Sequence, residues 1–190
     1  MGMPITVPTF TVDDLDQFPD DGTRYELLDG VLLVSPGPEL PHQVVTGRLF
    51  ALLADFLKPW PELLITSPGA IILRPKTQLE PDILVFRWPN GGPKWEAVQE
   101  HLLAVETTSR STVIYDRDFK RPAYLDLGVG EVWRVDLDQE AILVSRPGGP
   151  ADLAYRDEFV WAPKGHPSSL LIEVQPLFRG LANASLSCRP

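Results

Sequence analysis

The order and the kind of the predicted elements indicate an α/β (α+β) protein with a central mixed β-sheet flanked by helices. Three observations support this prediction. A tight hairpin precedes one long amphipathic helix over residues 41–57. Several short apolar runs of strand length follow that helix. A second helix, near residue 120, separates the apolar runs around residues 83–105 from those around residues 131–145.

Length and composition are those of one globular domain. The chain has 190 residues, of which 44% are apolar, and both values are typical of a single domain with its own core. We expect a flexible N-terminus over residues 1–10, a single domain over residues 11–178 and a C-terminal tail over residues 179–190. The sequence has neither the pattern of a signal peptide nor an apolar run of membrane-spanning length, so we expect no membrane association.

Cysteine, histidine and charge limit the chemistry. The single cysteine, Cys188, leaves no internal disulfide and no zinc site built from cysteines, which fits a reducing, cytoplasmic compartment. The three histidines, His42, His101 and His166, show no metal-ligand spacing. The net charge of −9 counts against a broad nucleic-acid-binding surface, which is normally basic. It does not exclude a nuclease whose metal ions offset the acids of its site.

The N-terminal part predicts a capped turn of helix and then a hairpin. Thr11 has the character of an N-cap. Asp29-Gly30 is a strong signal for a tight turn, flanked by strands over residues 25–28 and 31–34. Glu26 lies in the first of these strands, and the sequence by itself favours an exposed hairpin carboxylate over a residue of a functional site.

The long helix is predicted over Pro41–Leu57, and it ends before Pro59 and Pro61. For His42, in its first turn, we favour a structural role. The broad apolar face of this helix consists of Val44, Val45, Phe50, Leu52, Leu53, Phe56 and Leu57.

Strands continue to the end of the domain. Two are expected on either side of Pro68-Gly69, over residues 63–66 and 70–73. After the second helix, strands over residues 131–136 and 141–145 are expected to bury Trp133 in the core. A final small β region is expected over residues 153–155, 159–161 and 170–174.

Two short apolar runs each carry one carboxylate. Asp82 precedes the run Ile83–Phe86, and Glu106 follows the run Leu102–Val105. Burying a carboxylate costs several kcal/mol unless it is paired or bound to a metal, on the order of the penalties known for buried ions. If these strands are neighbours, both acids face a common point, where oxygen ligands could hold a hard divalent cation.

A lysine is placed to complete this set. Asp116, Lys120 and Tyr124 recur every four residues, so on a helix they share one face. Two acids and one lysine suit metal-assisted hydrolysis of a phosphodiester, because the acids hold the cation and the lysine stabilises charge or positions water. Pro122 means that the helix starts near Asp118 or is kinked after Lys120, which leaves the direction of the Lys120 side chain open.

At these residues the chain resembles the PD-(D/E)XK nuclease superfamily and, more narrowly, its Uma-type family of restriction-endonuclease-like proteins. The resemblance covers residues 11–178. One departure is Thr108, two positions after Glu106, where the superfamily has lysine; Lys120 stands where this family would place it. The matching residues are Tyr25 to Gly30, His42, Pro81-Asp82, Val105 to Ser109, Asp116, Lys120, Tyr124 and Gly128 to Trp133.

The resemblance implies a restriction-endonuclease-like core and a set of roles. Asp82 and Glu106 would bind Mg²⁺, with Mn²⁺ as a substitute, and the main-chain carbonyl of Thr107 would add a ligand. Lys120 would activate or position the attacking water. The resemblance also implies that Glu26 reaches toward the metal, that Tyr124 orients Lys120, and that His42 lies at the edge of the site.

Three functional hypotheses remain at this point. The first is an endonuclease acting on DNA, for which a homodimer would allow both strands to be cut; no protein partner can be inferred. The second is a catalytically inactive nuclease-like module for protein interaction or assembly. The third is a sugar hydrolase with Asp82 and Glu106 as its acid/base pair.

A purely structural role for Asp82, Glu106 and Lys120 also fits their spacing. Asp82 would cap a strand, and Glu106 would form a buried salt bridge with Lys120. The basic cluster beside the site is equally open, since it fits either a solvated helix face or a phosphate-contacting surface. It consists of Arg110, Arg117, Lys120 and Arg121.

Overall fold

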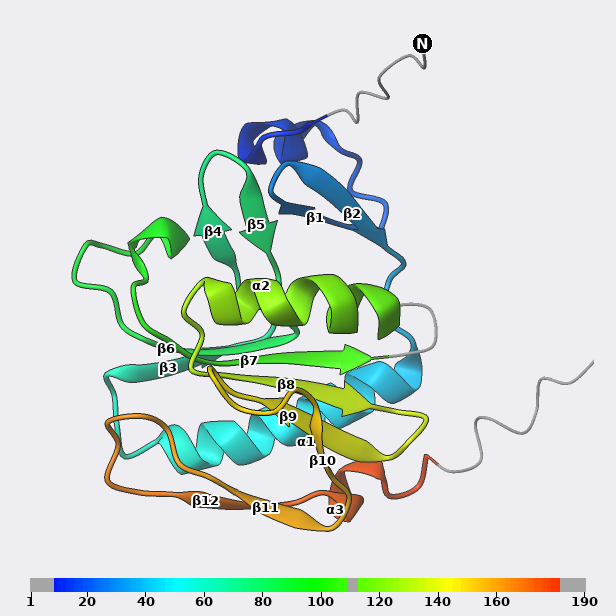
Figure 1. Ribbon diagram of the computed structural model, residues 1–190, viewed down its shortest axis with the longest axis vertical. Helices are drawn as coiled ribbons and strands as arrows, with labels where there is room; N and C mark the ends of the chain where they lie inside the picture. The colour runs from blue at the N-terminus through cyan, green and yellow to red at the C-terminus, as the bar shows by residue number, and fades with distance from the viewer. Residues whose placement is uncertain (1–8, 109–112, 182–190) are drawn as a thin grey trace, which may run out of the picture.

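Three β-sheets and a few helices make up residues 9–108 and 113–181, the part of the chain that the computed structural model describes (Figure 1). The largest sheet has six strands in the order β10-β9-β8-β7-β6-β3. In chain order these are β3 (Leu63–Thr66), β6 (Ile83–Arg87), β7 (His101–Thr108), β8 (Glu131–Asp136), β9 (Ala141–Ser145) and β10 (Leu153–Tyr155).

This central sheet is mixed, as predicted. Strands β7 and β8 run parallel, whereas every other neighbouring pair is antiparallel. In the β6–β7 pair, Ile83 lies opposite Val105. Asp82 and Glu106 therefore lie on neighbouring strands at the same end of the sheet, which confirms the arrangement on which the site prediction depends.

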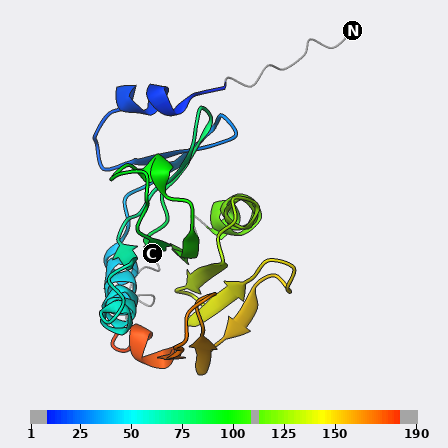
Figure 2. The same cartoon turned by 90° about the vertical axis from the view of Figure 1, so that its left-hand side faces the viewer.

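Helices lie on both sides of these strands (Figure 2). On one side is α1 (Leu40–Leu57), which buries Val45, Leu49 and Leu53 at four-residue spacing. On the other side, η3 (Tyr115–Lys120) continues into α2 (Arg121–Asp126). Although α1 is 18 residues long, none of the helices in the described ranges is both long and apolar enough to cross a membrane.

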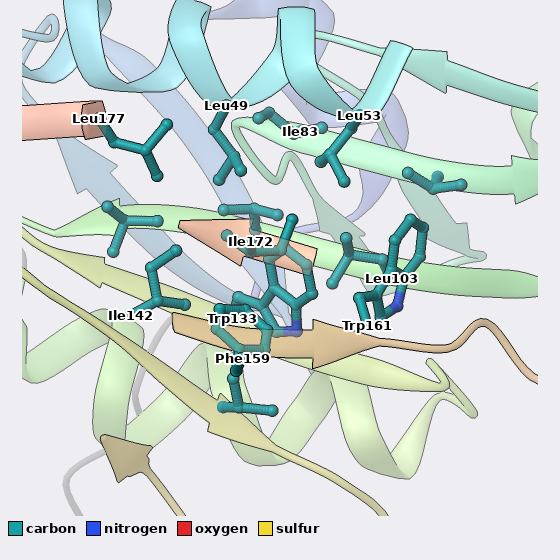
Figure 3. Close-up of a cluster of buried hydrophobic side chains, with 14 of the residues drawn as sticks. Leu49, Leu53, Ile83, Leu103, Trp133, Ile142, Phe159, Trp161, Ile172 and Leu177 are labelled. Carbon is teal, nitrogen blue, oxygen red and sulfur yellow. The ribbon is translucent and has the colours of Figure 1, made fainter. Parts of the chain in front are cut away.

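The main core lies between α1, the sheet and the C-terminal segment (Figure 3). Leu49 and Leu53 of α1 point toward Ile83 and Leu103 of the sheet. Trp133 is fully buried, as expected for a core residue, with its ring centroid 5.6 Å from that of Trp161. Such aromatic pairs add to the stability that burial gives, because edge-to-face rings attract electrostatically.

A second sheet, in the order β2-β1-β5-β4, stands at one end of the molecule (Figure 1). The predicted hairpin is confirmed: Asp29 and Gly30 both have positive φ, 51° and 82°, as a tight primed turn requires. The strands are β1 (Arg24–Leu28), β2 (Val31–Ser35), β4 (Ile71–Leu73) and β5 (Thr77–Leu79).

Strands β3 and β4 flank Pro68-Gly69 as predicted, but they belong to different sheets. The Gly69 N–H donates to the Pro81 carbonyl at 3.0 Å, so the chain turns between the sheets at this point. Strand β5, which the sequence did not predict, lies between β4 and β1 and pairs with both, so it joins β4 to the hairpin.

The remaining elements are short. The Thr11 cap is confirmed: its backbone N–H and its hydroxyl both donate to Asp14. At the C-terminal end, β10 joins the central sheet, whereas β11 and β12 form a sheet of their own, so the predicted small β region is divided. The elements not yet given are η1 (Val12–Gln17), η2 (Trp95–Ala97), β11 (Glu158–Trp161), β12 (Leu170–Glu173) and α3 (Gln175–Phe178).

Pro122 is accommodated by a π-helical segment. Instead of starting near Asp118 or breaking after Lys120, the helix widens over Tyr115–Lys120, where the Arg121 N–H bonds to the carbonyl of Asp116 five residues earlier. Pro122 then falls in the first turn of α2, where a missing N–H costs little. Such π-segments are frequent at functional sites.

The predicted termini fall mostly on residues 1–8 and 182–190, which lie outside the described residues. The division into a domain and two flexible ends therefore stays a prediction.

Candidate active site

A cavity of about 120 Å³ opens where the central sheet meets the hairpin sheet and α1. Four of the predicted site residues, Asp82, Glu106, Thr107 and Lys120, line this cavity. The other lining residues are Arg24, Ser35, Pro36, Gly37, Pro38, Glu39, His42, Asp116 and Leu137.

Asp82 is a buried acid of the site, 4% exposed. Its Oδ1 accepts from Arg24 Nη1 at 2.9 Å, and its Oδ2 lies 3.0 Å from His42 Nε2. The backbone N–H of Thr107 also donates to Oδ2, at 2.8 Å. Burial by itself would raise the pKa of Asp82, but His42, Arg24 and the Thr107 N–H outweigh burial, so the pKa lies below its usual value.

Glu106 lies inside β7, because Thr107 and Thr108, which were expected to leave the strand, continue it alongside β8. Its Oε1 accepts from the Tyr124 hydroxyl at 2.5 Å and from Lys120 Nζ at 3.2 Å. Burial raises the pKa of Glu106 well above its usual value, and although Lys120 opposes this, the nearby carboxylates, among them Asp116, add to the rise.

Lys120 lies among acids and is only 3% exposed. Its Nζ is 2.5 Å from Glu26 Oε2, 3.2 Å from Glu106 Oε1 and 3.9 Å from Asp116 Oδ1. Burial opposes a charge on this amine, but the three carboxylates dominate, so the pKa of Lys120 is raised and the side chain stays a cation at neutral pH. The direction that Pro122 had left open is thus toward Glu106.

Glu26 corrects the expectation of an exposed hairpin carboxylate. It is fully buried, and its Oε1 accepts the backbone N–H of Glu80 at 2.7 Å, while Oε2 faces Lys120. The side chain therefore points inward to Lys120 but is not among the residues that line the cavity, so its reach toward a metal stays a prediction. Its partner is the lysine, which η3 places against this face of β1.

Tyr124 is also fully buried. Its hydroxyl donates to Glu106, so it fixes the carboxylate that Lys120 contacts. Burial and the neighbouring charge of Glu106 raise the pKa of Tyr124 well above its usual value, which keeps the phenol a donor.

Two residues of the cavity were not predicted in their observed roles. Arg24, which the sequence analysis did not single out, pairs with Asp82; its spacing of two from Glu26 on one strand was a usable signal. His42, for which a structural role was favoured, contacts the same carboxylate.

The basic cluster is only partly visible, because Arg110 lies outside the described residues. Nε and Nη2 of Arg117 donate to Oδ1 and Oδ2 of Asp118 at 2.7 and 2.8 Å. Arg121 donates to the Arg117 carbonyl at 3.1 Å. Both contacts are those of an ordinary helix surface.

The cavity can be compared with the needs of a divalent cation. In residues 9–108 and 113–181, no group of three His, Cys, Asp or Glu side chains forms a closed metal site. Mg²⁺ does not need one, since it keeps several waters and uses one or two carboxylates. Burial and, after it, the neighbouring carboxylates raise the pKa of Glu106, and an added cation would offset both. Asp82 and Glu106 therefore fit a weakly held, partly hydrated ion.

The arrangement of elements is shared with a solved structure. The crystal structure of a putative nuclease belonging to DUF820 from Anabaena variabilis ATCC 29413 superposes with a TM-score of 0.70. The match covers 89% of this chain and 97% of that chain at 19% sequence identity, which establishes likeness of fold. No curated protein matches the chain.

The sequence itself matches a family profile from residue 12 to residue 186, which is nearly all of the described domain. The family is described as "Putative restriction endonuclease". The residues on which the resemblance was based, among them Asp82, Glu106 and Lys120, fall inside this match, and the chain belongs to the Uma2 family.

Proposed function

We propose that this protein is a divalent-metal-dependent endonuclease that hydrolyses phosphodiester bonds in DNA. One observation carries the proposal: Asp82 and Glu106, from neighbouring antiparallel strands, line one cavity together with Lys120. Membership of a family described as "Putative restriction endonuclease" favours DNA as the substrate class. Cutting both strands would need two such sites, which a homodimer would supply.

The proposed cofactor is Mg²⁺, or Mn²⁺ in its place. Asp82, Glu106 and the main-chain carbonyl of Thr107 would hold it, an all-oxygen set of the kind that this ion prefers. When bound, such an ion supplies Lewis-acid stabilisation of the phosphate and lowers the pKa of a bound water. Burial raises the pKa of Glu106, so a bound cation that compensates its negative charge would favour the deprotonated form that can act as a ligand.

Lys120 would act as a fixed cation. Its raised pKa keeps it protonated at neutral pH, so it cannot take a proton from water while its three carboxylates are in place. It can orient a water by donating a hydrogen bond and can stabilise the charge that develops on the phosphate. Glu26 and Tyr124 would serve by holding Lys120 and Glu106 in position.

The test is metal-dependent cleavage. Supercoiled plasmid, linear duplex and single-stranded DNA are incubated with the purified protein and Mg²⁺, Mn²⁺ or chelator. We expect nicking that requires metal and is lost in Asp82→Ala and Lys120→Ala. The matched control is Glu100→Gln, because Glu100 is an exposed acid that pairs with Arg87 away from the cavity. Undiminished cleavage by Asp82→Ala would overturn the proposal.

The inactive module remains as a second candidate because one observation favours it. Both of the proposed metal-binding acids already have a cationic partner within the chain, Arg24 for Asp82 and Lys120 for Glu106. This is the buried salt-bridge arrangement of a structural site. The module predicts no cleavage and a melting temperature indifferent to millimolar Mg²⁺ or Mn²⁺, whereas a clear rise argues for a metal site.

A further inference from the structure

We propose that Arg24 is the phosphate-binding residue of this cavity and that its Nε and Nη2 groups receive two oxygens of the phosphodiester. The inference deepens the proposed nuclease function and depends on it. It assigns to Arg24 the substrate contact that a nuclease of this type would otherwise be expected to make through its lysine.

The first step is the charge of the cavity. Its lining contains the acids Glu39, Asp82, Glu106 and Asp116. A phosphodiester is an anion, so it can approach such a lining only where cationic groups face it. Among the described lining residues, Arg24 and Lys120 are the side chains with a permanent positive charge.

The second step excludes Lys120 as the main contact. Its side chain is 3% exposed, and its ammonium has carboxylates of Glu26, Glu106 and Asp116 around it. Two of these carboxylates are close to the ammonium, Glu26 at 2.5 Å and Glu106 at 3.2 Å, so a phosphate that contacted Lys120 would compete with both buried partners. Leaving a buried carboxylate without its cation is strongly unfavourable.

The third step is the geometry of Arg24. Its side chain is 23% exposed, and within the described residues both of its hydrogen bonds come from one nitrogen. Nη1 donates to Asp82 Oδ1 at 2.9 Å and to the Glu80 carbonyl at 3.3 Å. The side-on pair of donors, Nε and Nη2, is therefore left for a ligand.

That pair has the right shape for phosphate. The planar guanidinium presents Nε and Nη2 in parallel, which matches two oxygens of a phosphate group, and lysine cannot reproduce this fork. The same side-on geometry occurs in this chain where Arg117 holds both oxygens of Asp118. Asp82 in turn fixes the guanidinium plane, so a phosphate bound by Arg24 would lie beside the proposed metal ligand.

The experiment measures binding separately from chemistry. A short fluorescein-labelled DNA duplex is titrated with the protein by anisotropy, in Ca²⁺ and in chelator, over a series of salt concentrations. We expect Arg24→Lys to weaken binding by roughly tenfold, the loss typical of one charge-assisted bidentate contact, with an unchanged salt slope. Arg24→Ala should also lower the magnitude of the slope by about 1.

A structural role for Arg24 would give a different result. If Arg24 only holds Asp82, Arg24→Lys would change the melting temperature and the Mn²⁺ titration midpoint but leave duplex binding as in wild type, which would overturn the inference. The matched control is Arg87→Lys, since Arg87 is an exposed arginine paired with Glu100. It should leave binding unchanged.

The two proposals fail in different ways. If the wild-type protein neither binds duplex nor cleaves it, the nuclease function is overturned and the role of Arg24 falls with it. If wild type cleaves and Arg24→Lys binds and cleaves equally well, only the role of Arg24 is overturned.

Discussion

The backbone N–H of Thr107 donates a 2.8 Å hydrogen bond to Asp82 Oδ2, and this bond joins the start of β6 to the strand that carries Glu106. Because side chains alternate along β7, Thr107 faces α1, where its hydroxyl lies 2.7 Å from that of Thr46, while Glu106 faces Lys120. One dipeptide thus anchors the site to the helix on one face of the sheet and to the lysine on the other.

Replacing Glu106 by glutamine should abolish cleavage and stabilise the protein. The pKa of Glu106 is raised above the ordinary value of 4.5, so the folded state holds a proton that the unfolded chain releases. Stability therefore falls as the pH rises from about 4.5 through the raised pKa. Glu106→Gln keeps the shape and removes this penalty. A gain of about 1 kcal/mol would raise Tm by about 2–4 °C.

Calorimetry at pH 5 and pH 8 checks this expectation. The gain should be larger at pH 8, where the wild-type carboxyl bears more of its cost. A variant that melts below wild type at pH 8 would show that the bond to Lys120 outweighs the cost of burying the charged carboxylate among other acids.

Replacing Lys120 by methionine should be strongly destabilising. It leaves the buried carboxylates of Glu26, Glu106 and Asp116 without their shared cation. Removing one partner of a buried pair costs about 3–5 kcal/mol. The loss of stability relative to wild type should be smaller at low pH, because the carboxyl groups take up protons there. Urea unfolding of Lys120→Met at pH 5 and pH 7 measures both effects.

A double-mutant cycle with Glu26→Gln isolates the closest of these pairs. Glu26→Gln should recover part of the loss, because it removes one uncompensated charge, so the two changes should be non-additive. Additive losses would mean that Glu26 and Lys120 do not interact energetically despite their contact.

The sequence predicts those parts of the site that depend on a local pattern of residues. The runs before Glu106 and after Asp82 are apolar and short, and this pattern is enough to predict two buried strands. The four-residue spacing of Lys120 and Tyr124 fixed a common helix face. Strand β7 extends beyond Glu106 because β8 pairs with Thr107 and Thr108, and a polar run gives no sign of such a neighbour.

The remaining differences come from contacts between distant segments. Glu26 is buried because Lys120 of η3 and the backbone of Glu80 lie against it, and neither contact is visible in the alternation of β1. Local rules for Pro122 allow a helix start or a kink, and neither rule predicts the π-helical segment over Tyr115–Lys120. Arg24 was missed because its importance depends on Asp82, which lies 58 residues away.

His101 should make the protein less stable in mild acid. Burial lowers the pKa of His101 to about 4 from an ordinary value of 6.5, so below pH 6.5 the unfolded state binds more protons than the folded state. Stability should fall as the pH drops from 6.5 to 4, by as much as about 3 kcal/mol. His101→Gln should flatten this part of the profile, as measured by urea unfolding at several pH values. Equal slopes for the two proteins would contradict the expectation.

Gly69 is expected to tolerate no side chain, although its place in a turn suggests an ordinary loop glycine. A Cβ at Gly69 would overlap the Cβ of Leu84 and lie 2.9 Å from its Cδ2, and Leu84 is a buried residue of β6. Gly69→Ala should therefore cost about 1–3 kcal/mol by overpacking. Because the Gly69 N–H holds the Pro81 carbonyl, the strain should reach Asp82 and lower cleavage as well.

Gly47→Ala is the matched control. Gly47 lies on the exposed side of α1, and a Cβ there meets no atom within 4 Å. Alanine should stabilise this helix position by roughly 0.5–1 kcal/mol, because glycine loses more backbone entropy on folding. Urea unfolding of both variants should thus give changes of opposite sign. Equal stability of Gly69→Ala and wild type would show that β6 can shift away from the turn and that Asp82 is not held from this side.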